Sequence, residues 1–312
     1  MKAIVFNEYG GSNKINSTAA AQIPVLKPNH VLVNVKAASL NRMDSMLLAG
    51  HLKDFFPLDL PAVIGGDFAG IIVSAGEGVT DLIAGDEVYG QSSQALGGSG
   101  SLADYTIVRS DKLVKRPKKI TMAEAASLPM AGASVIQALE DHMKLQSGQK
   151  ILIHGGTGSI GSLAIQLAKH HGAFVAATAD GQYAELVKSL GADLVIDYKP
   201  QDFTMLISDY DAVLVTAESA LYGSCQILKK GGVLVFLVGD ADENLTKKHE
   251  ITAISQMTEV SLAQLDRQRV LIENGSMKPV IDKTFSFDDS KEAFNYFENA
   301  HPKGKIIIVI NS

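Results

Sequence analysis

Apolar residues follow two different spacings along this chain, and the spacing changes near residue 121. Before that point they alternate with polar residues in short runs such as residues 30–37, and Gly, Pro, Asn and Asp separate the runs, which is typical of β-strands. After it, residues 121–143 follow a helical spacing, and short runs rich in Val, Ile and Leu then alternate with amphipathic segments. The pattern therefore predicts a β-rich domain followed by an α/β domain.

The second part of the chain alternates predicted strands with predicted helices. Because short buried strands separated by helices are typical of a parallel sheet covered on both faces, we expect a doubly wound α/β fold there. The strands are expected at residues 150–154, 173–178, 194–197, 212–215 and 233–239, and the helices at residues 160–171, 183–190 and 219–228.

The C-terminal residues change character again. A strand at 283–287, a helix that opens at Asp289 with Glu292 as its capping-box partner, and a strand at 305–310 predict a β-α-β unit. Lys305, which opens the last strand, is interpreted as a solvated lysine. We expect this unit to return to the first domain, so the predicted domains are residues 1–120 with 272–312, and residues 121–271.

Composition narrows the class of protein. A chain of 312 residues with 46% hydrophobic residues can bury two cores, and its net charge of −6, without a block of Lys or Arg, argues against nucleic acid and anionic membranes as partners. The single cysteine, Cys225, excludes an intrachain disulfide and any site built from several thiolates of one chain. The first residues read as a strand rather than a signal peptide, so we expect a cytoplasmic protein.

A glycine-rich turn lies between the predicted strand at 150–154 and the helix after it. The pattern G-x-G-x-x-G needs one glycine for the tight turn, a second so that a pyrophosphate can approach bare backbone, and a third for close helix–strand packing. A tight turn that binds nothing would show the same glycines, but the flanking strand and helix favour a dinucleotide site. The residues of the motif are Gly156, Thr157, Gly158, Ser159, Ile160 and Gly161.

The identity of the dinucleotide is left open by the residues alone. Asp180 follows Gly161 at the spacing where a carboxylate usually binds the ribose hydroxyls of NAD. However, the strand at 173–178 is expected to end near Thr178, so Asp180 could instead cap the helix that begins near Tyr183.

Motifs of other reactions are missing. No tyrosine is followed by lysine at the fourth position, and the chain has neither a G-x-S-x-G elbow nor H-E-x-x-H. A nicotinamide cofactor would then carry the difficult step while the protein supplies position and electrostatics. Hydride transfer to an already polarised acceptor meets this condition.

Six stretches carry a resemblance to a known family: AASLNRMD at residues 37–44, PAVIGGDFAGIIVSAGEGV at 61–79, GDEVYG at 85–90, AASLPMAGASVIQAL at 125–139, ILIHGGTGSIGSLAIQLAKHHGA at 151–173 and VKSLGADLVIDY at 187–198. Together they resemble the medium-chain dehydrogenase/reductase superfamily, in particular its zinc-free quinone oxidoreductase (zeta-crystallin-like) branch. The resemblance implies a GroES-like catalytic domain built from both chain ends, a central Rossmann domain, and a cleft between them where nicotinamide and substrate meet.

The resemblance also assigns roles at the nicotinamide end. Asn41 corresponds to an asparagine that reaches the nicotinamide ribose or the substrate carbonyl, and Asp44 to a residue that orients its turn. Ser134 corresponds to a hydroxyl near the nicotinamide, although a serine in mid-helix can also bond to a preceding carbonyl. The backbone segment that meets the carboxamide corresponds to Leu237, Val238 and Gly239.

Zinc-dependent members of the superfamily place metal ligands at positions that fall on Asn41, Asp67 and Met130 here. Methionine is a poor zinc ligand, and Asn and Asp alone do not build a closed site of nitrogen and sulfur donors. We therefore expect no zinc.

At the adenosine end, Thr178 and Tyr198 fit the relatives that use NADPH. Gln182 stands where those relatives carry a basic residue, and Asp180 would repel a ribose phosphate. The expected cofactor is NADPH, with NADH as the alternative.

These expectations combine into an NAD(P)H-dependent oxidoreductase that reduces quinones or α,β-unsaturated carbonyls without a metal. The alternatives are a zinc-free enoyl-thioester reductase or alcohol dehydrogenase, and a non-catalytic NADPH-binding or redox-sensing protein. A homodimer formed by edge strands of the Rossmann domain is compatible with the apolar run at 231–239, although a buried central strand would show the same pattern.

Overall fold

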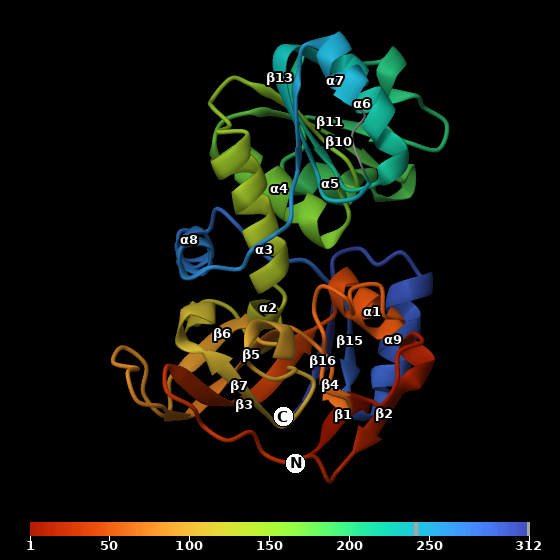
Figure 1. Ribbon diagram of the computed structural model, residues 1–312. Coiled ribbons are helices and arrows are strands. Elements are labelled where there is room, and N and C mark those ends of the chain that lie inside the picture. Colours follow the sequence, from red (N-terminus) through yellow and green to blue (C-terminus); the bar gives the residue numbers. More distant parts are fainter. Residues whose placement is uncertain (240–242, 311–312) are drawn as a thin grey trace. The chain divides into compact units, whose positions relative to one another are not determined.

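The computed structural model describes residues 1–239 and 243–310, and within them the chain folds into two compact units (Figure 1). The first unit is built from Met1–Met130, Val260–Glu273 and Val280–Ser312, and the second from Ala131–Glu259 and Asn274–Pro279. The first unit is rich in β-strands and the second holds a parallel sheet with helices, which confirms the predicted fold class.

The first unit combines two sheets with short helices. Its strands are β1 (Ala3–Phe6), β2 (Ile15–Thr18), β3 (His30–Ser39), β4 (Ala62–Val63), β5 (Asp67–Ala75), β6 (Glu87–Gln91), β7 (Tyr105–Arg109), β8 (Leu113–Lys115), β15 (Ile281–Ser286) and β16 (Lys305–Val309). Its helices are α1 (Arg42–Ala49), α2 (Met122–Ala126), α8 (Leu262–Glu273) and α9 (Ser290–Asn299). In the described residues, one sheet has the order β2-β1-β4 and the other the order β15-β16-β3-β5-β6-β8, with β7 paired to β3.

Strand β3 shows why these residues form a half-buried sheet. Val31, Val33 and Val35 are buried, while the residues between them are partly exposed, as a period of two predicts. The C-terminal segment joins the same sheet: β15 and β16 pair in parallel, and β16 pairs antiparallel with β3. The predicted return of the C-terminal β-α-β unit to the first part of the chain is therefore confirmed.

The second unit is a parallel sheet with helices packed against it (Figure 1). Its strands are β9 (Lys150–Ile153), β10 (Phe174–Ala179), β11 (Leu194–Asp197), β12 (Tyr210–Val215), β13 (Leu228–Phe236) and β14 (Thr252–Ser255), and its helices are α4 (Ser159–His170), α5 (Ala184–Ser189), α6 (Leu221–Ile227) and α7 (Glu243–His249). In the described residues the order is β11-β10-β9-β12-β13-β14, and every pairing in it is parallel. This is the doubly wound dinucleotide-binding order.

Five of these strands were predicted, and β14 was not. Thr252–Ser255 is a short strand with partly exposed side chains and no apolar run, so periodicity gives no signal for it. Helix α3 (Pro129–Ile136) and a π-helical turn (Gln137–His142) precede β9.

The unit boundaries differ from those predicted. The first unit extends to Met130 rather than residue 120, and it also contains residues 260–271, which we had placed in the second domain. Conversely, Asn274–Pro279, which we had placed in the first domain, belong to the second unit. Two hydrogen bonds explain the assignment of residues 260–271: the buried Tyr89 hydroxyl donates to the Leu265 carbonyl (2.7 Å), and the Lys112 ammonium donates to the Val260 carbonyl (2.8 Å). Helix α8 is therefore part of the first unit, although it follows the second unit in sequence.

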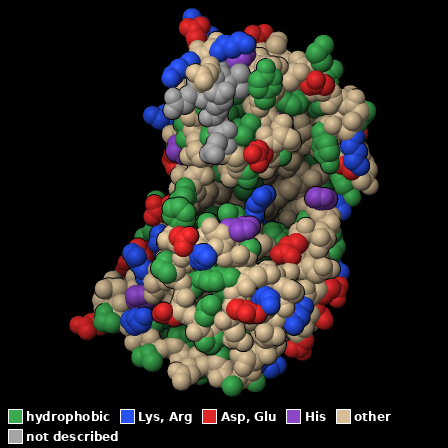
Figure 2. Space-filling model, turned by 45° about the vertical axis from the view of Figure 1, so that its right-hand side comes forward, with side chains coloured by type: hydrophobic (Ala, Val, Ile, Leu, Met, Phe, Trp, Pro, Cys, Tyr) green, Lys and Arg blue, Asp and Glu red, His purple; other side chains and the backbone are tan. Residues whose placement is uncertain are grey.

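Charged side chains of both signs are interspersed over the face seen in Figure 2. None of the described helices combines the length and the apolar character that crossing a membrane requires.

Candidate functional site

The glycine-rich turn connects β9 to α4. Gly155 adopts the left-handed conformation (φ +69°), and its carbonyl accepts the N–H of Gly158 at 2.9 Å, which closes the turn. The N–H of Gly156 donates to the Thr178 carbonyl (2.9 Å), which fastens the turn to β10. Gly158 caps α4, so the first N–H groups of the helix point toward this end of the sheet.

The three glycines of the motif are required for different physical reasons. A Cβ on Gly161 would lie 2.1 Å from the Gly155 carbonyl oxygen, and one on Gly156 would lie 3.1 Å from the Ala177 side chain. Glycine is therefore needed at both positions for close packing of helix and strand. A Cβ on Gly158 would meet nothing closer than 3.4 Å, so this glycine leaves bare backbone open at the helix N-terminus. The turn therefore fits a pyrophosphate.

A buried histidine, His154, stabilises this turn through hydrogen bonds with two hydroxyl groups. His154 Nδ1 lies 3.2 Å from the Thr178 hydroxyl, and Nε2 lies 3.0 Å from the Ser224 hydroxyl. Ser224 donates its proton to the Ala220 carbonyl (2.7 Å), so Nε2 carries the histidine proton and Nδ1 accepts from Thr178. Burial lowers the pKa of His154 to about 4, and the ring is neutral at pH 7.

The hydrogen bonds of this network use the donor proton of the Thr178 hydroxyl. Its hydroxyl donates to His154 and accepts the N–H of Gly155 (3.2 Å), and the residue is buried. The proton that a ribose phosphate would need is therefore already donated. In this structure Thr178 anchors the glycine-rich turn, a role different from the one that the resemblance implied.

Asp180 begins the loop after β10 and acts as a cap. It accepts the Gln182 N–H (3.2 Å) and the Gln182 side-chain amide (2.8 Å), and Lys199 lies 2.8 Å from its second oxygen. The Lys199 and Gln182 hydrogen bonds lower the pKa of Asp180 to about 2, so it is ionised at neutral pH. The capping interpretation is confirmed. Lys199, which we did not predict for this site, places a basic group beside Asp180. Tyr198 is exposed beside it.

The remaining predicted residues of the second unit are placed as follows. The Ser134 hydroxyl lies 2.8 Å from that of Thr258. Leu237 directly follows β13, at the carboxyl end of the sheet where the glycine-rich turn follows β9, and its N–H donates to the Val215 carbonyl (3.1 Å). Val238 and Gly239 continue this segment, and Thr157, Ser159 and Ile160 lie in the turn and the first turn of α4.

The first unit holds a buried polar cluster around Asn41, Asp44, Asp67 and Lys305. The Lys305 ammonium donates to Asn41 Oδ1 (2.6 Å) and lies 3.4 Å from Asp67 Oδ2. Asp44 accepts the Asn41 backbone N–H at 2.7 Å. Lys305 is only 4% exposed, so the interpretation of Lys305 as a solvated residue is wrong. Its position in an inner strand of the sheet explains the burial.

Burial dominates the electrostatics of the cluster. Desolvation raises the pKa of Asp44 to about 7, although the Asn41 N–H opposes this shift. Desolvation also raises the pKa of Asp67 and lowers the pKa of Lys305, and each of these two charges opposes the shift of the other. A pair that is excluded from water in this way needs further hydrogen bonds, which Met130 N–H (3.2 Å) gives to Asp67.

The residues at the positions that zinc-dependent members use as ligands have a chemistry that does not fit zinc. Lys305 places an ammonium against Asn41 and Asp67, where a cation would have to bind, and Met130 reaches Asp67 through its backbone N–H. Among the described residues no group of three His, Cys, Asp or Glu side chains could hold a metal ion.

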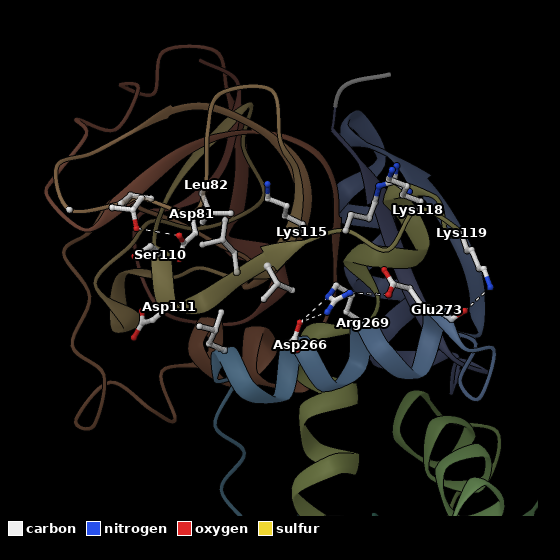
Figure 3. Close-up of a pocket in the computed structure, with 17 residues that line it drawn as sticks. Asp81, Leu82, Ser110, Asp111, Lys115, Lys118, Lys119, Asp266, Arg269 and Glu273 are labelled. Atoms are coloured by element: carbon white, nitrogen blue, oxygen red, sulfur yellow. Dashed lines mark hydrogen bonds and ion pairs between the residues drawn. The ribbon is translucent and has the colours of Figure 1, made fainter.

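A separate pocket of about 850 Å³ opens beside α8 in the first unit (Figure 3). Three of its charged residues are paired with one another: Arg269 lies 2.8 Å from Asp266 and 2.9 Å from Glu273. Lys119 donates to the Glu273 carbonyl (2.6 Å). None of the residues in the predicted site lines this pocket.

A doubly wound sheet with an open glycine turn, together with a β-rich unit that carries an amide and carboxylates, defines a dinucleotide-dependent oxidoreductase of two units. Family models agree with this assignment. Residues 27–118 match the alcohol dehydrogenase GroES-like domain, and residues 190–308 match the zinc-binding dehydrogenase model.

Similar proteins place the chain within this class. It is 38% identical to the NADPH-dependent alkenal/one oxidoreductase, chloroplastic, of Arabidopsis thaliana and to the 2-methylene-furan-3-one reductase of Solanum lycopersicum, covering 99% of this chain and 79% of each relative. The structure of the quinone oxidoreductase from Coxiella burnetii matches with a TM-score of 0.90 and 28% identity, over 100% of this chain and 99% of the other. The chain therefore belongs to the medium-chain dehydrogenase/reductase superfamily, in its branch of quinone oxidoreductases and alkenal reductases.

Proposed function

We propose that this protein uses NADPH to reduce quinones or α,β-unsaturated carbonyl compounds by hydride transfer, without a metal ion. The observation that carries the proposal is the glycine-rich turn, in which Gly161 has no room for a side chain and Gly158 leaves the backbone bare. The NADPH-dependent relative that is 38% identical supports both the cofactor and the acceptor class.

The second unit would bind the cofactor. The backbone of residues 156–161 and the N-terminus of α4 would hold the pyrophosphate, and Lys199 with Tyr198 would face the adenosine ribose. When bound, NADPH supplies a hydride, which the protein itself does not carry. The residues of this chain would bind the cofactor and orient it.

The first unit would serve the acceptor. A quinone gains one hydride and one proton to give a hydroquinone, and an enal or enone gains the hydride at its β-carbon and the proton at its α-carbon. In either case negative charge develops on the carbonyl oxygen before the proton arrives from solvent. Asn41 is the partly exposed donor of the buried cluster, and its amide would stabilise this oxygen.

Metal independence is supported by the position of the Lys305 ammonium between Asn41 and Asp67. Metal analysis of the dialysed protein tests it, because about one zinc per chain would contradict the proposal.

The decay of NADPH absorbance with a panel of quinones, enals and enones tests the activity. We expect turnover with members of both classes. Turnover only with enoyl thioesters or alcohols, or tight NADPH binding without any turnover, would replace this function by one of the alternatives.

We also propose a homodimer and a cytoplasmic location. The apolar run considered for edge pairing lies in β13, which is an inner strand, so β14, the last strand of the sheet in the described residues, is the edge that we propose for pairing. The only cysteine, Cys225, is a buried free thiol. Light scattering of the purified protein and microscopy of a tagged protein test the two statements. A monomer, or targeting to an organelle, would contradict them.

A further inference from the structure

The buried ammonium group of Lys305 contacts the side-chain oxygen of Asn41. Its three ammonium hydrogens meet three oxygen acceptors: the Leu40 carbonyl at 3.1 Å, Asn41 Oδ1 at 2.6 Å and Asp67 Oδ2 at 3.4 Å. Lys305 and Asp67 are both buried, whereas Asn41 is partly exposed. A ligand could therefore reach Asn41, but not the two charges that hold it.

We propose that Lys305 is a positioning residue that sets the orientation of the Asn41 amide and strengthens it as a donor to the carbonyl oxygen of the acceptor. This inference rests on the proposed function, in which Asn41 stabilises that oxygen.

The chemistry of the two partners determines which way the amide points. A lysine ammonium only donates hydrogen bonds, so the Asn41 oxygen must face it. The hydrogen bond with the Asn41 side chain lowers the pKa of Asp67 against the effect of burial, so the Asp67 carboxylate accepts from this amide. A flipped amide would set its NH₂ group against the ammonium and its oxygen against the carboxylate. One hydrogen on Nδ2 is then directed to Asp67, and the other can donate to a ligand.

The same contact changes the strength of the donor. A cation that hydrogen-bonds to an amide oxygen draws electron density away from the nitrogen, and hydrogen bonds in series polarise one another more in a buried environment. The Asn41 N–H thus becomes a better donor to a developing negative charge than an amide in water. This benefit grows in the transition state, because the charge on the acceptor oxygen grows there.

The backbone holds the amide in place as well. The N–H of Leu40 donates to the Ile306 carbonyl (3.1 Å), and the Asn41 N–H donates to Asp44 (2.7 Å). Strand β16 therefore fixes the Asn41 turn from both the main chain and the Lys305 side chain, and little reorganisation is needed when the acceptor binds.

A double-mutant cycle tests whether Lys305 acts through Asn41. We expect Asn41→Ala and Lys305→Met each to lower kcat by about 10- to 100-fold with little change in the KM for NADPH or acceptor, because the lost interaction belongs to the transition state. The double variant should be no slower than Asn41→Ala alone. Multiplied effects in the double variant, or an unchanged kcat in Lys305→Met, would overturn the proposal.

Folding needs its own control, because Lys305→Met leaves Asp67 buried without a cation. The variant Lys305→Met with Asp67→Asn removes both charges and should fold, with the same loss of kcat. Lys283→Met, in the neighbouring strand β15, is the matched control: this lysine is exposed and pairs with Glu292 (3.4 Å), and its loss should leave kcat unchanged.

A readout that needs no turnover separates this proposal from the proposed function. In nitrogen-15 NMR spectra, the Asn41 side-chain amide, assigned by its loss in Asn41→Ala, should be shifted and protected from exchange with water. We expect both properties to vanish in the variant that lacks Lys305 and Asp67. An unaltered amide signal would overturn the proposal, while a wild-type protein without reductase activity but with this signal would contradict only the function.

Discussion

The Lys199 ammonium lies 2.8 Å from Oδ2 of Asp180, and this ion pair joins the loops that follow the adjacent parallel strands β10 and β11. Both loops lie at the carboxyl end of the sheet, the end at which dinucleotides bind to this fold. The pair therefore sets an acidic and a basic group side by side at the place where we propose that the adenosine ribose binds.

Asp180→Asn should shift the cofactor preference toward NADPH. Removing the carboxylate eliminates its repulsion of the 2′-phosphate and releases Lys199 to bind it, so we expect the ratio of kcat/KM for NADPH to that for NADH to rise about tenfold. Lys199→Met should lower the same ratio. Steady-state kinetics with both cofactors measure it, and Glu185→Gln, which removes an exposed acid on α5, is the control. An unchanged ratio in both variants would place the ribose phosphate elsewhere.

Alanine substitutions at two motif glycines should have opposite signatures. Gly161→Ala drives a Cβ into the Gly155 carbonyl, and we expect it to lower the free energy of unfolding by about 2–3 kcal/mol. Gly158→Ala has room in the free protein, so its stability should stay within about 0.5 kcal/mol of the wild type while NADPH affinity falls at least about tenfold. Urea unfolding and fluorescence titration measure the two quantities. Normal NADPH affinity in Gly158→Ala would refute pyrophosphate binding at this turn.

His154 should make the protein acid-sensitive. The pKa of His154 is lowered from 6.5 to about 4 on folding, so the unfolded state binds a proton more readily. The contribution of the neutral His154 to the free energy of unfolding is fully present above pH 6.5 and is lost as the pH falls toward 4. The total loss is about 3 kcal/mol. His154→Gln, although less stable at pH 8, should lose less stability between pH 6.5 and 4 than the wild type. Urea unfolding across this range tests it, with the exposed His51→Gln as control. Parallel curves for wild type and His154→Gln would contradict the neutral buried histidine.

Tyr89→Phe tests the assignment of α8 to the first unit. The Tyr89 hydroxyl is buried and donates to Leu265, so its loss should lower the free energy of unfolding by about 1 kcal/mol. Hydrogen exchange should become faster in α8 and stay unchanged in α4. Equal acceleration in both helices would contradict the observed boundary.

The sequence predicted the features that depend on local pattern. Five of the strands of the second unit follow from buried apolar runs, and Gly161 could be recognised because helix–strand packing leaves no room for its Cβ. Asp180 was predicted with two roles, and the choice between them needed Lys199, which pairs with it across two loops. A lysine that directly follows Tyr198 is the only signal that sequence offers for this residue.

Lys305 and His154 were missed for a different reason. A lysine at the start of a strand and a histidine at the end of one carry the same local pattern whether they are buried or solvated. Their roles depend on partners that are 264 and 70 residues away in the chain, Asn41 and Ser224. Only the fold of each unit, the strand order around β16 and the packing of α6 beside the end of β9, brings these partners together.

The distance between Asn41 and Lys305 in the chain also has a consequence for biosynthesis. At about 5–20 residues per second, a ribosome makes Lys305 on the order of 10–50 s after Asn41. Strand β3 must wait for that interval before β16 pairs with it, whereas Ala131–Glu259 can already fold. The second unit is thus expected to mature during translation, and the first unit only when synthesis is nearly finished.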